Sequence, residues 1–293
     1  MILKGHGLLA GLLIVGGAQA QLQDHSPVVG QGASTAVSPK AVARATGAPW
    51  SSLPTLSASF GGGRGAAALR LSGIDADKVT VFAPGGASER RVVDYPVADG
   101  RASIQASAPM MGNYHWAQAR EVRNGVVRVA STVWYFSNPG DAPTALLDRP
   151  KSELEIVPQP LPREHAHYRE SEKWRFLVRW QGQPLPGQAL TLETEQGSRS
   201  MAFTDDEGVA TLVFPRDLGA QKVEAGAHGR RERAGFVLST AYSTGDQTYL
   251  TAFNRVYVPE AERSRSLAWG AAFGFVGMMI ATPLLRRKES DHA

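Results

Sequence analysis

The chain has 293 residues, no cysteine and a formal net charge of +4 at pH 7. Without cysteine it has neither disulfides nor thiolate metal ligands, so each domain must be held together by its own core. The net charge is small for the length and cations alternate with acids, which excludes the basic footprint of a nucleic-acid-binding protein.

The first segment is MILKGHGLLAGLLIVGGAQA, residues 1–20. It has one cation (Lys4), an apolar run at residues 8–15, and small residues at Ala18 and Ala20. This pattern predicts a secretory signal peptide cleaved after Ala20. The alternative is an uncleaved N-terminal anchor, which needs about 20 apolar residues, and a glycine pair ends this run earlier.

Residues 21–53 are rich in Ala, Ser, Gly and Pro and lack apolar periodicity. Such a composition buries too little apolar surface to offset the entropy of ordering. We expect a flexible spacer here.

A first β domain is predicted at residues 54–140. Runs such as AAALRLSG, KVTVFAPGG and VVRVASTVWYFS recur at strand-and-turn spacing, and none keeps a helical period over more than two turns.

A second β domain is predicted at residues 150–258. In KWRFLVRW, the side chains of Trp174, Phe176, Val178 and Trp180 fall on one face and those of Arg175, Leu177 and Arg179 on the other, as in a half-buried antiparallel strand. About seven strands precede the C-terminal segment. The expected fold class is all-β, with two immunoglobulin-like β-sandwich domains followed by one transmembrane helix.

The acidic triplet at residues 205–207 lies between two of these strands. A Ca²⁺ loop needs acids at alternate positions, whereas these are consecutive. We therefore interpret Asp205 and Gly208 as a hairpin corner, with Gly208 supplying a positive φ. Gly182 and Gly187 are assigned the same turn role in the preceding QGQPLPG segment.

A metal site is a hypothesis for the segment EHAHYRE. On a strand, His165 and His167 would project from one face, with Glu164 and Glu170 as nearby oxygen ligands. The expected ion is a transition metal such as nickel, cobalt or zinc. The alternative is a polar edge or loop before the Trp174 strand.

No catalytic residues are assigned. The sequence lacks a G-x-S-x-G elbow, an H-E-x-x-H helix and any cysteine nucleophile. We do not expect an enzyme.

Residues 266–285 form an uncharged stretch that is long enough to span a bilayer, and it predicts a single transmembrane helix. The basic residues directly after it predict a cytoplasmic tail at residues 286–293. Gly270 and Gly274 form a G-x-x-x-G pair that would allow close helix packing and self-association. A cleaved signal, one anchor and no cysteine favour a Gram-negative inner membrane, with most of the chain in the periplasm.

Two further motifs follow each other at residues 182–210. A G-x-P-L-x-G turn is formed by Gly182, Pro184, Leu185 and Gly187, and a T-D-x-x-G-x-A corner by Thr204, Asp205, Gly208 and Ala210. With these motifs, residues of about 152–258 resemble the NikM-like periplasmic domain associated with nickel and cobalt uptake, a relative of transthyretin-like and carboxypeptidase-regulatory-like sandwiches.

The resemblance implies an exported, membrane-anchored accessory domain that presents metal to a transport system. Among the possible ligands, His167 falls inside the matched block. The transporters of that family have several spans, whereas this chain has one predicted span, so a permease role is not expected. The expected function is a membrane-anchored periplasmic binding or accessory protein linked to nickel or cobalt uptake. The alternative is a structural scaffold, or a partner subunit of an envelope transporter or receptor, with no metal role.

Overall fold

The computed structural model describes residues 49–60, 65–107, 113–136, 142–163, 166–218, 233–260 and 270–279. The predicted signal peptide and most of the predicted spacer lie outside the described residues.

The first half of the chain forms two facing sheets. One has the order β1-β2-β5 and the other contains β4-β3-β6-β7. The strands are β1 (Thr55–Phe60), β2 (Ala66–Ser72), β3 (Lys78–Phe82), β4 (Val92–Pro96), β5 (Arg101–Gln105), β6 (Asn113–Arg123) and β7 (Val126–Phe136), with a 3-10 turn, η1 (Ser88–Arg90), before β4.

The second half repeats this arrangement. When the two-residue strands β9 and β11 are set aside, β10 pairs with both β8 and β14 in one sheet, and the other sheet has the order β13-β12-β15-β16. Counted in chain order within each half, the first, second and fifth strands form one sheet, and the fourth, third, sixth and seventh form the other. This is the arrangement of an immunoglobulin-like sandwich. The elements are α2 (Thr144–Asp148), β8 (Leu154–Pro158), β9 (Tyr168–Arg169), β10 (Lys173–Trp180), β11 (Gln183–Pro184), β12 (Ala189–Thr194), β13 (Arg199–Phe203), β14 (Val209–Val213), β15 (Ala234–Thr244) and β16 (Gln247–Val258).

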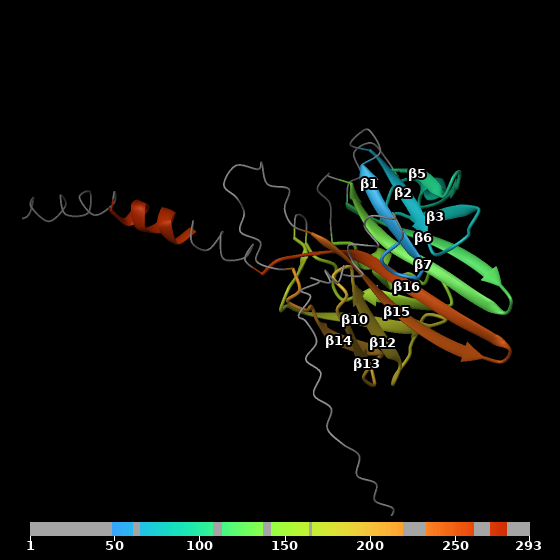
Figure 1. Cartoon of the computed structure of the whole chain (residues 1–293). Helices are drawn as coiled ribbons and strands as arrows, with labels where there is room; N and C mark the ends of the chain where they lie inside the picture. Colours follow the sequence, from blue (N-terminus) through green and yellow to red (C-terminus); the bar gives the residue numbers. More distant parts are fainter. Residues whose placement is uncertain are drawn as a thin grey trace, which may run out of the picture. The chain divides into compact units, whose positions relative to one another are not determined.

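The two halves are joined through their last strands. β16 pairs in parallel with β7, from Thr248 opposite Val126 to Phe253 opposite Ser131. As a result, strands of both halves belong to one nine-stranded sheet, with β13 at one end of its main path and β4 at the other. Figure 1 shows β7 and β16 side by side at this junction. The sequence predicted two sandwiches but gave no sign that they share a sheet.

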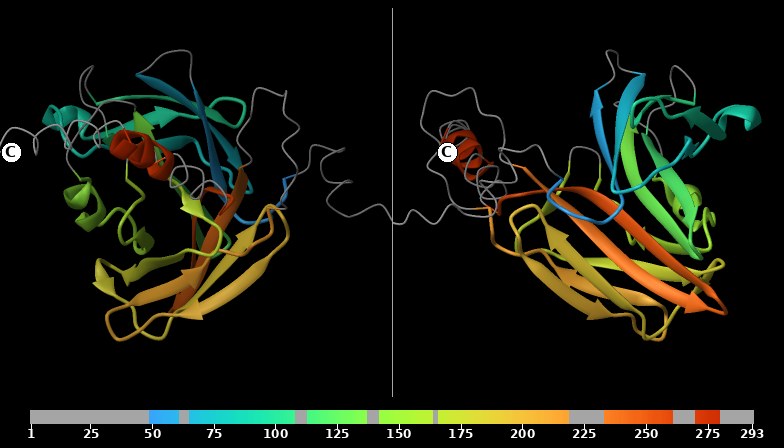
Figure 2. Two further views of the ribbon diagram at one scale, coloured as in Figure 1. Left: turned by 90° about the vertical axis from the view of Figure 1, so that its left-hand side faces the viewer. Right: turned by 45° about the vertical axis from the view of Figure 1, so that its right-hand side comes forward.

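Each half has its own core, and the two cores lie on opposite faces of the shared sheet. On β6, Trp116 belongs to the second-half core and Ala117 to the first-half core. On β16, Phe253 belongs to the second-half core, while the adjacent Asn254 side chain binds the backbone of Leu56 on β1 at 2.8 and 2.9 Å. Successive strand residues point to opposite faces, so one sheet serves both cores. In Figure 2, the blue β1–β2 strands and the yellow strands of the second half lie on different sides of the orange β15–β16 pair.

The described end of the predicted spacer, residues 49–53, makes contacts with the second half. Ser51 is buried and donates a hydrogen bond to Glu193 Oε2 at 3.3 Å, and the Trp50 ring covers Gly235. Within residues 49–53, Ser51 is thus the buried position, while Trp50 remains 39% exposed.

The C-terminal segment is described only at residues 270–279, which are helical. The rest of the predicted span at 266–285 and the tail at 286–293 lie outside the described residues. Among the helices in the described part of the chain, none is both long and apolar enough to cross a membrane.

Candidate functional site

The predicted metal ligands are only partly described. Glu164 and His165 lie outside the described residues. His167 directly precedes β9, and its Nε2 lies 3.5 Å from Nη2 of Arg233. A guanidinium beside an imidazole nitrogen opposes the approach of a metal cation to it.

Glu170 has a structural role. Its side chain is buried, and Oε1 accepts a hydrogen bond from Leu218 N at 2.7 Å. Oε2 accepts one from Glu260 N at 3.3 Å. The carboxylate thus ties β9 to the segments that follow β14 and β16. Within the described ranges, no group of three or more His, Cys, Asp or Glu residues is placed to hold a metal ion.

Asp205 and Gly208 form the corner between β13 and β14. Asp205 Oδ1 accepts from Val209 N at 2.8 Å, and Gly208 N donates to Asp205 O at 2.9 Å. Gly208 has φ +74°, and a Cβ there would lie 2.8 Å from Leu185 N. Glycine is needed both for the backbone conformation and for the close approach.

The two sequence motifs meet in space. Thr204 Oγ1 donates to Leu185 O at 2.6 Å and accepts from Gln188 N at 2.8 Å. Gly187 N donates to Thr204 O at 3.0 Å. The G-x-P-L-x-G turn and the T-D-x-x-G-x-A corner therefore form one hydrogen-bonded unit. This structural role accounts for the residue types of both motifs without a bound ligand.

A buried charged cluster holds the linker between the two sandwiches. Arg179, on β10, donates through Nε to Glu155 Oε2 at 2.6 Å and through its two Nη atoms to backbone oxygens of Asp148 and Arg149. Glu155 Oε1 accepts from Lys151 N at 2.9 Å. Because these charges are paired and hydrogen-bonded, they fix the path of the linker.

Lys151 belongs to the same cluster and its side chain is fully buried. Its Nζ donates to Arg149 O at 2.7 Å, lies 4.0 Å from Glu155 Oε1 and lies 4.7 Å from the centre of the Trp116 ring. Burial lowers the pKa of Lys151 to about 8, although Glu155 acts in the opposite direction. Burying the ammonium is therefore unfavourable, and the carboxylates of Glu155 and Asp148 compensate this cost only in part.

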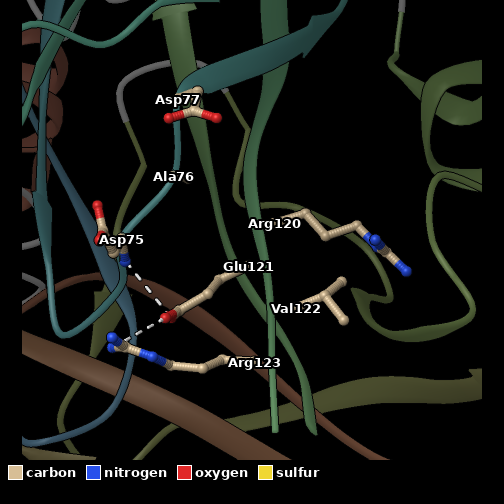
Figure 3. A pocket seen from close by; sticks show the side chains of 7 residues that line it. All are labelled: Asp75, Ala76, Asp77, Arg120, Glu121, Val122 and Arg123. Carbon is tan, nitrogen blue, oxygen red and sulfur yellow. Dashed lines mark hydrogen bonds and ion pairs between the residues drawn. The ribbon is translucent and has the colours of Figure 1, made fainter. Parts of the chain in front are cut away.

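Two shallow hollows share Arg120 in their lining. The first, about 340 Å³, includes Asp75, Asp77 and Glu121. In Figure 3 the Glu121 carboxylate is already engaged by Asp75 N at 3.4 Å and by Arg123 at 4.0 Å. The second, about 490 Å³, is lined by linker residues that include Lys151. The Ser152 hydroxyl, also in the second lining, donates to Leu154 O at 3.0 Å.

The edge strand β13 carries exposed apolar side chains. Met201 is 59% exposed and Phe203 is 63% exposed. β13 pairs with β12 along one side, and no described strand pairs with its other side. We call Met201, Phe203 and this unpaired strand the β13 edge.

Sequence reasoning missed the buried cluster and the β13 edge. Arg179 alternates with the large apolar residues of its strand, a pattern that predicts an exposed side chain, yet it is only 4% exposed. The acidic and basic run DRPKSELE before β8 was the available signal for its partners. Gly270 and Gly274 both lie in the helical segment at 270–279, where a Cβ on either would meet nothing within 4 Å among the described residues.

Comparisons with known proteins gave limited matches. No family model matches the chain, and no curated protein matches it. Among solved structures, it is similar to the D0-D1 domain of intimin, with 13% identity over 66% of this chain and 89% of that one, at a TM-score of 0.23. It is also similar to a two-domain fibronectin type III segment of chicken tenascin, with 11% identity over 69% of this chain and 97% of that one, at a TM-score of 0.21.

Proposed function

We propose that this chain is a non-enzymatic, membrane-anchored envelope protein whose second sandwich binds a partner protein through the β13 edge. The partner would contribute an extended segment that pairs with β13 as an additional strand. The β13 edge is the single observation that carries this proposal.

The exposed chemistry of β13 supports it. A sheet edge offers unpaired N–H and C=O groups, and native proteins usually protect such an edge with charge, proline or a covering element. Here Arg199 is the charged side chain of the strand, and it pairs with Glu193 at 2.9 Å, leaving Met201 and Phe203 beside the open edge. Backbone pairing would give affinity, and the two apolar side chains would give specificity.

The sequence at both ends supports envelope localisation. A signal-like N-terminus and an uncharged stretch at residues 266–285 followed by three cations are typical of an exported protein with one C-terminal anchor. The sandwiches would then face the periplasm, where a transporter or receptor subunit is available as a partner.

A role in nickel or cobalt delivery has weaker support. Glu170 is held by two backbone amides, and His167 faces a guanidinium. We therefore favour a scaffold or partner-subunit role over metal presentation.

Site-specific crosslinking tests the proposal. A photo-crosslinking residue is placed at Met201 or Phe203 in the full chain in its own membrane. Val92 on β4, 38% exposed, and Val122 on β6, 56% exposed, are the matched control positions. We expect the same envelope protein to be captured at both β13 positions and at neither control, and to bind the purified chain directly.

Capture at all four positions, or at none, would overturn the proposal. Crosslinking to a second copy of this chain would also overturn it, because it would assign the β13 edge to self-association.

A further inference from the structure

Arg255, on β16, has an unusual environment for a strand arginine. Its Nη1 donates to Val133 O at 2.7 Å. Its Nε is buried, and it has no hydrogen-bond partner in the structure as described. Among the described residues, no carboxylate forms an ion pair with this guanidinium, and its Nε is left without an acceptor.

A second unsatisfied donor lies in the same region. Tyr168, on β9, is 1% exposed, and its Oη has no partner among the residues described. β9 pairs with β16 at Tyr257, two residues after Arg255, and the Tyr168 ring packs edge-on against Phe236, the cross-strand neighbour of Arg255. The Tyr114 hydroxyl, from β6, donates to Pro162 O at 2.8 Å and is already engaged.

The surrounding charges are positive. Arg233 contacts His167 at 3.5 Å and forms no ion pair with a described carboxylate. Acids on the neighbouring segments have other partners: Glu170 binds two backbone amides, Glu172 pairs with Arg169 at 3.5 Å, and Asp217 binds the hydroxyls of Tyr257 and Thr194. Burial lowers the pKa of Arg255; Tyr114 and Tyr168 act in the opposite direction, and the positive charge of Arg233 lowers it again.

We propose that the Nε–Nη2 side of Arg255, with Tyr168 Oη and Arg233, forms an anion site that takes an oxyanion such as a carboxylate or phosphate group. Arg255 is partly buried and lacks a described counter-charge, which is unfavourable for a cation, and the unpaired donors Arg255 Nε and Tyr168 Oη add to that cost. An oxyanion would supply both the missing counter-charge and the missing acceptors. Two of its oxygens can accept hydrogen bonds from the Arg255 guanidinium, and one can also accept from the Tyr168 hydroxyl.

Calorimetric titration of the full chain in detergent tests this site. Inorganic phosphate and acetate are titrated separately, at constant ionic strength in a chloride background. We expect saturable binding of at least one of them. Binding of phosphate alone assigns the site to phosphate groups, and binding of both assigns it to oxyanions in general.

Three variants locate the binding. Arg255→Met should weaken it by at least about tenfold, since it removes the charge and the fork. Tyr168→Phe keeps the packed ring and should weaken it by about three- to tenfold through loss of one donor. Arg175→Met removes an exposed strand arginine and should change nothing.

The thermal midpoint in chloride gives an independent readout. Replacing the partly buried Arg255, which has no described counter-charge, by Met should leave this midpoint unchanged or raise it. No saturable binding of either anion would overturn the proposal. Equal affinity in the Tyr168→Phe variant would do the same, and this holds even if Arg255→Met does not fold.

Discussion

The two sandwiches share one strand order but fill their cores with different side chains. The first-half core is rich in alanine, with Ala67, Ala102, Ala117 and Ala119 all nearly or fully buried. The second-half core is built on aromatic rings, among them Tyr168, Phe176, Phe214, Phe236 and Phe253. The same topology is thus compatible with close backbone packing in one half and with large rings in the other.

Their edges differ as well. β4, at the first-half end of the shared sheet, ends in Pro96 and carries Asp94, which pairs with Lys78 at 2.5 Å. Hydrogen bonds from Lys78 and Thr80 hold the pKa of Asp94 below its usual value. β13, at the other end, exposes Met201 and Phe203. The charge and proline of β4 are typical of an edge strand that is protected against pairing with another chain. β13 has less protection, so the second half is the one expected to bind a partner strand.

The largest effect is expected from Phe236→Ala in the aromatic core. Phe236 is fully buried and contacts the rings of Tyr168, Phe214 and Tyr257. Truncation should lower the free energy of unfolding by about 3–5 kcal/mol, measured by chemical denaturation of the full chain. A loss below about 1 kcal/mol would show that this core is loosely packed.

The alanine-rich core of the first sandwich should be destabilised by added volume rather than by lost volume. Ala117→Leu adds volume at a fully buried position between β3 and β7. We expect a loss of about 1–3 kcal/mol through overpacking, determined in the same denaturation assay. A neutral or stabilising result would indicate unfilled space in the first sandwich.

The linker between the two halves should respond to pH through Lys151. Its pKa is about 8 in the folded protein, below the ordinary lysine value of 10.5. Below pH 8 both states are protonated and the folded state carries the full penalty. Between pH 8 and 10.5 the unfolded chain binds more protons, so stability should rise with pH.

Relative to Lys151→Met, the wild-type protein should gain about 1–3 kcal/mol over that interval. Denaturation curves of both proteins at several pH values measure the difference. Parallel pH profiles would contradict the burial of the Lys151 ammonium.

A smaller effect should separate two turn glycines. Gly208→Ala in the second sandwich places a Cβ 2.8 Å from Leu185 N, whereas Gly100→Ala in the first meets nothing within 4 Å among the described residues. Both have positive φ, at +74° and +68°. The first change should cost about 1–2 kcal/mol more than the second in thermal or chemical unfolding. Equal costs would assign the whole effect to backbone strain.

The sequence predicted much of the fold because its signals are local. Alternation in KWRFLVRW identified β10 and its core face, as Phe176 and Val178 are fully buried. Asp205 and Gly208 predicted a corner because their turn chemistry involves only the next few residues.

The remaining features depend on contacts distant in sequence. The parallel pairing of β7 with β16 joins residues more than 100 positions apart, and no periodicity encodes it. Arg179 has the alternation of a surface residue, and its burial becomes apparent only when Glu155 lies opposite it on β8. The predicted ligand pattern of His167 and Glu170 did not show that backbone amides occupy the Glu170 carboxylate.

The most direct test of a binding role for the second sandwich compares the two ends of the shared sheet. Once the crosslinked partner is identified, its affinity is measured for the full chain carrying Phe203→Lys on β13 or Val92→Lys on β4. The account predicts at least about tenfold weaker binding for the β13 variant and unchanged binding for the β4 variant. Equal affinities for the two variants would contradict it.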